Sequence, residues 1–268
     1  MNTRLRKLLI EIVPVYGVLC LAGCTQGVTR EQRAWLDEGR GAYERQDYVR
    51  AIPSLDRFLS EAPPGSDTPE ALYLRGMCRA QTGRRPDAYS DLHRAALLAS
   101  KNTELAWRTY LVLGTLYFED EKWDPAAQSY RAALERMPEP PAPPRDHVLF
   151  RLGLCHERLG QWSFALRFYG DLARQFGSGP YAEGAQRRLE LRTDHFAIQA
   201  GAFRTRANAE NLVADLGRKG LHAAIHEESR NRTPIYIVLI GSYASYDEAR
   251  SHLEMIKRNF VPQAVMWP

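Results

Sequence analysis

The stretch Phe196-Ala-Ile-Gln-Ala-Gly-Ala-Phe203 decides the fold of the C-terminal part of this 268-residue chain, together with Ile235-Tyr-Ile-Val-Leu-Ile-Gly-Ser-Tyr243. Each is a run of apolar and β-branched residues that ends in small residues, which is typical of a strand followed by a turn. A helical pattern of apolar residues follows each run, over residues 207–220 and 246–259. Strand then helix, twice, predicts a small two-layer module made of two related halves.

Two further extended runs, His222–Glu228 and Ala264–Trp267, complete the order strand, helix, strand, strand, helix, strand over residues 194–268. This order predicts a four-stranded antiparallel sheet with both helices on one face and an open second face. Side chains alternate between the two faces of a strand. In the third strand the alternation places three aliphatic residues on the open face: Ile235, Ile237 and Leu239.

This C-terminal module resembles the SPOR (sporulation-related repeat) domain over Asp194–Trp267. The resemblance lies in the pattern Phe196-x-Ile198-Gln199-x-Gly201-x-Phe203 and in the later Val238-x-Ile240-Gly241-x-Tyr243. It implies a periplasmic domain that binds peptidoglycan and prefers glycan strands from which amidases have removed the stem peptides.

The residues expected to bind glycan lie on or beside the open face: Gln199, Ala202, Ile237, Leu239 and Trp267. We expect Gln199 to be the main hydrogen-bonding residue, because its amide both donates and accepts. The chain departs from the family at Ile237, where an arginine is common, and at Ser242, where a proline is frequent. Arg230 and Arg232, in the hairpin before this strand, are an alternative source of the missing donor. The aliphatic face could instead bind protein or self-associate, and Trp267 could either cover part of it or stack on a sugar ring.

Nucleic-acid binding and catalysis are not expected. RNA-recognition modules share the strand order, but they stack bases on aromatic residues of the two central strands, which here carry Ile198, Gln199, Ile237 and Leu239. No catalytic Ser/His/Asp set, phosphate-binding glycine loop or carboxylate pair stands out, so we expect neither an enzyme nor a cofactor. His222 and His226 would lie about 13 Å apart along one strand, too far to share a metal ion.

A repeat precedes this module. Four glycines, spaced by 37, 38 and 39 residues, are each followed twelve residues later by an alanine: Gly39, Gly76, Gly114 and Gly153. A repeat of this length with small residues in its helices resembles the tetratricopeptide repeat (TPR), whose basic unit has 34 residues. It predicts an α-solenoid of four helix pairs and a closing helix over residues 31–191.

Such solenoids present a concave groove. The positions expected to line it are apolar: Tyr43, Tyr73, Met77, Phe118, Phe150 and Leu154. Our hypothesis is that a peptide or partner helix binds there; the alternative is that these residues pack against neighbouring repeats. The segment Gln175–Ala182 resembles that of periplasmic repeat proteins in outer-membrane assembly and Tol-Pal coordination.

Residues 1–24 have the pattern of a secretory signal, with basic residues followed by an apolar run from Leu8 to Leu21. The segment ends in Leu21-Ala22-Gly23-Cys24, which resembles the bacterial lipobox and implies a lipid on Cys24. Thr25, rather than aspartate, follows the cysteine, which implies sorting to the outer membrane. The alternative is an ordinary signal peptide with a coincidental cysteine. Residues 25–30 form a linker of at most ~20 Å.

The composition suits packed domains, with 44% hydrophobic and 25% charged residues. A formal net charge of +4 does not by itself indicate a nucleic-acid partner. The four cysteines imply no disulfide framework, and we expect Cys78 and Cys155 to be small buried hydrophobic residues.

The resemblances imply a non-enzymatic lipoprotein on the periplasmic face of the outer membrane, enriched at the division septum. It would bind peptidoglycan through the SPOR domain and partner proteins through the groove, in cell division or envelope organisation. The alternative is an envelope-assembly or Tol-Pal-like scaffold whose SPOR-like domain binds protein rather than glycan.

Overall fold

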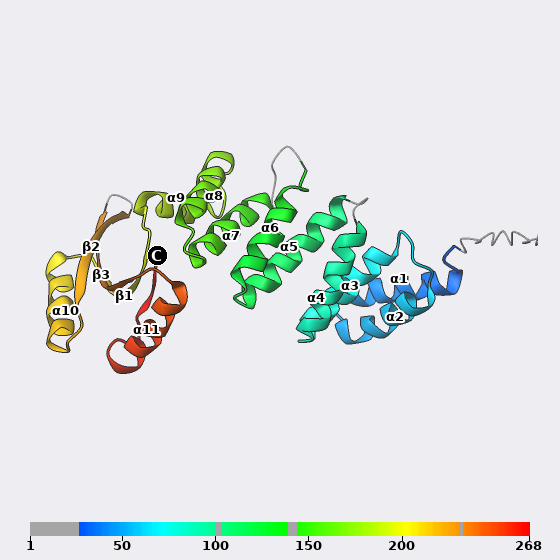
Figure 1. Cartoon of the computed structure of the whole chain (residues 1–268), viewed down its shortest axis with the longest axis horizontal. Helices are drawn as coiled ribbons and strands as arrows, with labels where there is room; N and C mark the ends of the chain where they lie inside the picture. Colours follow the sequence, from blue (N-terminus) through cyan, green and yellow to red (C-terminus); the bar gives the residue numbers. More distant parts are fainter. Residues whose placement is uncertain (1–26, 100–102, 139–143, 231–232) are drawn as a thin grey trace, which may run out of the picture.

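The computed structural model describes residues 27–99, 103–138, 144–230 and 233–268. The predicted signal segment and Cys24 therefore lie outside the described residues, as does Arg232. The molecule is elongated, with a helical repeat domain (residues 27–191) at one end and the C-terminal module at the other (Figure 1).

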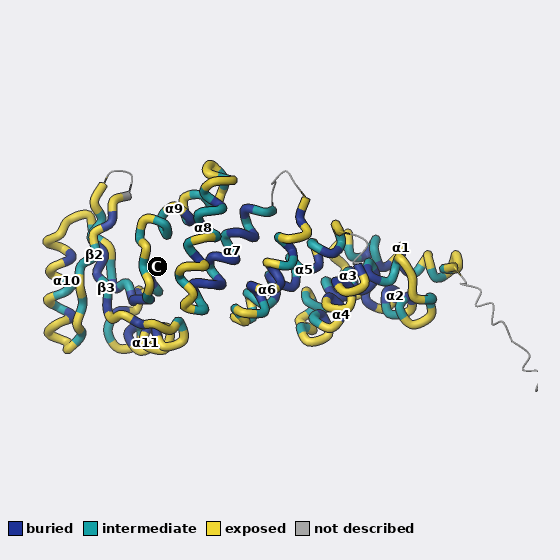
Figure 2. Tube along the Cα trace, turned by 45° about the horizontal axis from the view of Figure 1, so that its top comes forward, coloured by how far each residue is buried: buried dark blue, intermediate teal, exposed yellow. Residues whose placement is uncertain are grey.

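The repeat domain contains four helix pairs and a closing helix, as predicted. The pairs are α1 (Arg30–Glu44) with α2 (Tyr48–Glu61), α3 (Thr68–Gln81) with α4 (Arg85–Leu98), α5 (Thr103–Glu119) with α6 (Trp123–Leu134), and α7 (Arg145–Arg158) with α8 (Trp162–Gln175); α9 (Ala182–Leu191) closes the stack. Buried residues follow the seams between neighbouring helices (Figure 2).

The repeated glycines are required by close helix contact. A Cβ atom built on Gly39 would lie 2.6 Å from Cγ of Leu55, and one on Gly153 would lie 2.2 Å from Cε1 of Tyr169. Real Cβ atoms do not approach this closely, so only glycine lets the paired helices meet at these points. The repeated alanines are buried beside these contacts: Ala51, Ala88, Ala126 and Ala165.

A buried carboxylate joins the first two helix pairs. Asp91 of α4 is 2% exposed and accepts hydrogen bonds from Nη2 of Arg75 at 2.6 Å and from Nη1 of Arg79 at 2.9 Å. Nη1 of Arg75 also donates to Asp56 of α2 at 2.7 Å. The two arginines therefore bridge α2 and α4 through α3.

The C-terminal module has the predicted order of elements. These are β1 (Phe196–Phe203), α10 (Arg206–Arg218), β2 (Ala223–Arg230), β3 (Thr233–Tyr243), α11 (Tyr246–Asn259) and β4 (Val265–Trp267). The strands form one antiparallel sheet in the order β2-β3-β1-β4. Both helices pack on one face, where Ile198, Val238 and Ile240 meet Leu216 and Ile256 in the core.

A bulge in β1 determines which side chains share the open face. Gln199 pairs with Leu239, and Ala202 pairs with Ile237, with a register shift between Gln199 and Gly201. Strict alternation would put residues three apart on opposite faces. Because the bulge inserts one residue, Gln199 and Ala202 lie on the same side of the sheet. Ala202 is therefore a residue of the strand itself.

The module is docked against the last two helix pairs. The ring of Trp162, the first residue of α8, lies 4.8 Å from the ring of Phe196, the first residue of β1. The guanidinium carbon of Arg158 lies 4.0 Å from the ring centre of Tyr246, which also receives the edge of Trp123 at 5.8 Å. Aromatic and cation–π contacts therefore join the two domains.

A helix that crosses a membrane must be both long and apolar. Among the described residues, no helix is both long and apolar enough to cross a bilayer.

Candidate functional site

The open face of the sheet carries side chains from all four strands. The strand pairings place on it Ala197, Gln199 and Ala202 from β1, Ala224, His226 and Glu228 from β2, Ile235, Ile237 and Leu239 from β3, and Val265 and Trp267 from β4. All five predicted glycan-binding residues therefore lie on this face.

Three of those five residues are accessible. Ala202 is exposed, and Gln199 and Leu239 are half-buried. Gln199 and Leu239 are also paired across β1 and β3. An amide thus lies beside an aliphatic side chain and a small exposed residue, which suits hydrogen bonding to a hydroxyl or acetamide while a sugar ring rests on apolar atoms.

The other two residues are covered, which corrects the prediction that they meet a glycan. Ile237 is 0% exposed and Trp267 is 3% exposed. The Trp267 ring packs edge-on against the His226 ring at 5.2 Å, and its indole Nε1 donates to Oε1 of Glu228 at 3.3 Å. Because His226 pairs with Ile237, the indole from edge strand β4 extends over this part of the face. Neither side chain is accessible to a glycan in this structure.

The repeat domain reaches the same region. Arg187 of α9 donates from Nη2 to Oε1 of Glu228 at 3.2 Å and from Nε to Oε2 at 3.3 Å. The C-terminus lies between the sheet and α7 (Figure 1). Trp267 and a helix of the other domain therefore cover the part of the open face around Glu228.

A pocket of about 370 Å³ lies on the open face next to Trp267, whose ring is 6.2 Å from the His195 ring. Its polar lining consists of three imidazoles, from His195 just before β1, His222 just before β2, and His226 on β2. Nδ1 of His195 lies 3.0 Å from Oδ1 of Asp194. In the described part of the chain no three His, Cys, Asp or Glu side chains are arranged to hold a metal ion. The side chain of Arg230, a predicted alternative donor, lies outside what the structure describes.

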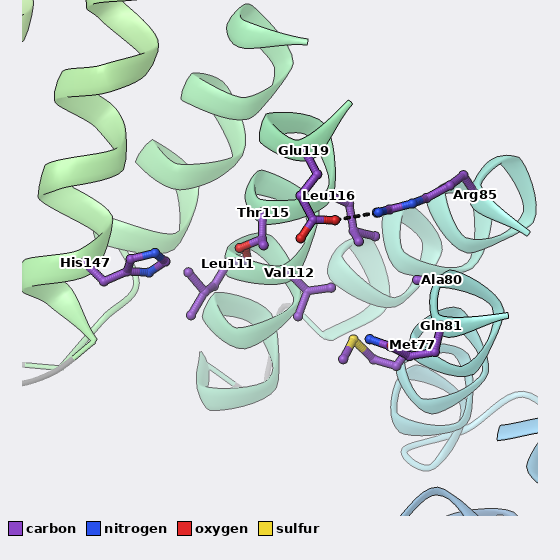
Figure 3. Close-up of a pocket in the computed structure, with 10 residues that line it drawn as sticks. All are labelled: Met77, Ala80, Gln81, Arg85, Leu111, Val112, Thr115, Leu116, Glu119 and His147. Carbon is purple, nitrogen blue, oxygen red and sulfur yellow. Dashed lines mark hydrogen bonds and ion pairs between the residues drawn. The ribbon is translucent and has the colours of Figure 1, made fainter. Parts of the chain in front are cut away.

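A second pocket lies in the groove of the repeat domain (Figure 3). It has a volume of about 420 Å³ and joins α3 and the start of α4 to α5 and the start of α7. Its lining is Met77, Ala80, Gln81, Arg85, Leu111, Val112, Thr115, Leu116, Glu119 and His147. Arg85 donates to Glu119 across one side of it. Burial lowers the pKa of His147, and Nε of Arg151 donates to Nε2 of this ring at 3.1 Å, so the imidazole accepts there.

Of the six predicted groove residues, Met77 lines this pocket. Four of the others pack within the repeats. Tyr43 contacts the Tyr48 ring at 6.0 Å, Tyr73 joins the cluster of the first pair, Phe118 meets the edge of Trp123 at 5.1 Å, and Phe150 stacks on Tyr181 at 5.3 Å. Leu154 is half-buried. The structure thus favours the packing alternative for these four aromatic residues.

The two described cysteines are buried and free, as predicted. Burial raises the pKa of Cys78 to about 11 and that of Cys155 to about 12. Both side chains therefore remain thiols at neutral pH and are poor nucleophiles.

Sequence reasoning missed the docking surface between the domains. Trp123 and Trp162 occupy the same position in consecutive repeats, at the first residue of the second helix. An aromatic residue recurring at the turn between two helices was a visible indication of a contact. Its partners, Phe196 and Tyr246, could not be identified without the fold.

Family models match both parts of the chain. The model described as the SPOR domain matches residues 193–267, and the model described as the tetratricopeptide repeat matches residues 36–106 and 111–183. In general terms, SPOR domains bind peptidoglycan, and tetratricopeptide repeats mediate protein–protein interaction. A search of curated protein sequences found no match.

Two solved structures illustrate the likeness of the repeats. MamA from AMB-1 is 20% identical, with a TM-score of 0.47 over 60% of this chain and 80% of that chain. A tetratricopeptide repeat protein from Parabacteroides merdae ATCC 43184 is 17% identical, with a TM-score of 0.51 over 71% of this chain and 68% of that chain. At this identity the second likeness shows the helical-repeat fold alone.

Proposed function

Because this chain belongs to the tetratricopeptide repeat proteins and carries a C-terminal SPOR domain, we propose that it is a non-enzymatic tether of the cell envelope. The SPOR domain binds glycan strands that lack stem peptides, and the repeat groove binds a periplasmic partner protein. A lipid on Cys24 anchors the chain to the periplasmic face of the outer membrane. Glycan binding concentrates the protein at the division septum.

The observation that carries the glycan proposal is the placement of Gln199. Its half-buried amide lies on the open face between exposed Ala202 and half-buried Leu239. A sugar chain offers hydroxyls and acetamides for hydrogen bonds and flat C–H faces for apolar contact. One amide set among small and aliphatic side chains matches both requirements.

The pocket in the repeat groove supports the partner role. Met77, Leu111 and Val112 give it an apolar wall, and the Arg85–Glu119 pair gives it a polar one. A partner segment with an aliphatic anchor and a flanking polar residue fits this lining. The raised pKa of both described thiols argues against nucleophilic catalysis by Cys78 or Cys155.

The test is co-sedimentation of residues 25–268, without the lipid, with purified sacculi before and after an amidase removes the stem peptides. We expect binding to rise with stripping and to fall about tenfold in Gln199→Ala, as loss of one or two hydrogen bonds implies. The matched control is Gln263→Ala, an exposed glutamine in the loop before β4. Absence of binding to both sacculus samples would overturn the proposal.

A second function is favoured by the covered part of the open face. Ile237 and Trp267 are buried, and α9 contacts Glu228 on the same side. This arrangement suits an envelope scaffold whose SPOR domain contacts protein. A septal fluorescent fusion distinguishes the two functions, because dispersal by Gln199→Ala favours the tether and unchanged localisation favours the scaffold.

A further inference from the structure

Removal of a stem peptide changes the charge of the glycan. An amidase adds water across the amide bond between the lactyl group of N-acetylmuramic acid and the first amino acid. The peptide leaves with a free amine, and the sugar retains a carboxylic acid, which is ionised at neutral pH. A stripped strand therefore carries an anionic group at each muramic acid that an intact strand lacks, and a binding face can recognise it directly.

The pocket beside Trp267 on the open face contains donors for such a group. His195, His222 and His226 contribute three imidazoles to one opening, and the small residues Ala197 and Ala224 leave room between them. His222 is exposed and His226 is half-buried. Imidazole N–H groups donate to carboxylate oxygens, and they do so more strongly when the ring is protonated.

The pocket also adjoins the residue proposed to hold the sugar. Leu239 lines the pocket and is the cross-strand partner of Gln199. Ala197, another lining residue, lies two positions before Gln199 on the same strand and the same face. A sugar bonded to Gln199 therefore has a neighbouring substituent within reach of the pocket.

His226 lies on β2 directly beside the strand position where the family arginine is missing. It is the cross-strand partner of Ile237, the position at which SPOR domains commonly carry an arginine. Directly opposed residues on neighbouring strands have Cβ atoms about 5 Å apart. The ring of His226 thus offers a donor next to the place where the arginine is missing.

Among the described residues, two carboxylates contact the histidines of the pocket or their neighbours. Asp194 contacts His195 at 3.0 Å. Beyond His226, the carboxylate of Glu228 contacts Arg187 and the indole of Trp267. The residues that line the pocket include no acidic side chain. Because Asp194 already contacts His195, the donors left for a bound carboxylate are His222 and His226.

We propose that this histidine pocket is a carboxylate subsite that recognises the lactyl carboxylate exposed when a stem peptide is removed. His226 takes the role of the missing arginine, and His222 is the second donor. The inference rests on the proposed glycan-binding function and specifies how stripped strands are distinguished from intact ones.

The experiment uses residues 25–268 and soluble glycan strands released from amidase-treated sacculi. Half of the strands are converted to neutral primary amides by carbodiimide and ammonia, which removes the lactyl charge and keeps the sugar. We expect the wild-type protein to bind the amidated strands about tenfold more weakly, as loss of a charge-assisted hydrogen bond implies. His226→Gln and His222→Gln should each weaken binding to the carboxylate strands and reduce that difference.

His222→Gln is the decisive variant, because the His222 side chain is exposed, whereas the His226 ring packs against Trp267. The matched control, His252→Gln on the exposed side of α11, should bind as the wild type does. Equal wild-type binding to both kinds of strand would overturn the carboxylate subsite and leave the glycan-binding proposal intact. If the wild-type protein bound neither the carboxylate strands nor the amidated strands, both the carboxylate subsite and the glycan-binding proposal would be overturned.

Discussion

Arg187 of the repeat domain and Glu228 of the SPOR sheet form a two-bonded ion pair across the boundary between the domains, with 3.2 Å between Nη2 and Oε1. The Glu228 side chain is 7% exposed, whereas that of Arg187 is 35% exposed. The indole of Trp267 donates to the same carboxylate. The pair therefore holds the C-terminal strand, the sheet and α9 together.

Replacing Arg187 by alanine should loosen this junction. We expect a loss of about 1–2 kcal/mol in the opening free energy of β2 and β3, less than for a fully buried pair because Arg187 is partly solvated. Native-state hydrogen exchange of the amides in both strands measures it. The matched control is Arg206→Ala, which removes an exposed pair with the neighbouring Glu227 at 3.0 Å and should change exchange by less than about 0.5 kcal/mol. Equal effects of the two variants would contradict the role of the junction.

Gly153→Ala should destabilise the last helix pair. The added methyl group would meet the Tyr169 ring at 2.2 Å, and overpacking of a filled interior costs about 1–3 kcal/mol. The midpoint of urea unfolding reports the change. Gly217→Ala in α10, where a methyl group meets no atom within 4 Å, is the control and should stabilise by about 0.5–1 kcal/mol. A stabilised Gly153→Ala protein would show that the helices can move apart.

Asp91→Asn keeps the shape of a buried side chain and removes its charge. Arg75 and Arg79 are 12% and 17% exposed, and both donate to this carboxylate. Breaking a buried charge cluster costs about 3 kcal/mol, which thermal unfolding should show as a lower midpoint. Asp37→Asn removes an exposed pair with Arg40 and should cost no more than about 0.5 kcal/mol. A midpoint like that of Asp37→Asn would mean that the cluster contributes little.

His156 should make the stability of the repeat domain depend on pH. Its ring stacks against Phe164 and Phe168, with ring centres 5.5 and 5.3 Å away, and burial lowers its pKa from the ordinary value of 6.5. The folded state thus binds the proton more weakly than the unfolded chain does. The stabilising contribution is complete above about pH 6.5 and is lost as the pH falls through the folded pKa.

Urea unfolding between about pH 7.5 and 5.5 should therefore show a decreasing free energy of unfolding. His156→Gln should reduce this dependence, and part of it should remain because burial also lowers the pKa of His93 and His147. An unchanged slope in His156→Gln would exclude this residue as a source of the effect.

The features that could be predicted from the sequence are those that a local pattern specifies. A small residue at a fixed phase is needed wherever two helices meet closely, so Gly39 and its equivalents revealed the repeats before any contact was known. Alternation along β3 likewise predicted that Val238 points to the core and Leu239 away from it, and the register confirms both.

Which parts of the open face are buried by other segments of the chain could not be predicted in the same way. Alternation assigns Ile237 to the open face, but it does not show whether that part of the face is covered. Ile237 is buried, and the ring of Trp267, from an edge strand 30 residues later in the chain, packs against its cross-strand partner His226. The bulge at Ala200 is equally non-local in its effect, because it reverses the side of every residue beyond it in β1. The ion pair between Arg187 of α9 and Glu228 depends on how the two domains meet. Neither the glycine repeat nor the alternation along the strands contains that information.

The contact between Trp162 and Phe196 has a consequence for any attempt to cut the protein in two. Phe196 is fully buried, and Trp162 and Arg158 of the repeat domain form part of its surroundings. Cleavage in the short segment between α9 and β1 would strip that side of the aromatic ring and expose it to water. The most obvious excision point in the chain is thus a poor one, because the last helix pair and the sheet share a hydrophobic boundary and should unfold as one cooperative unit.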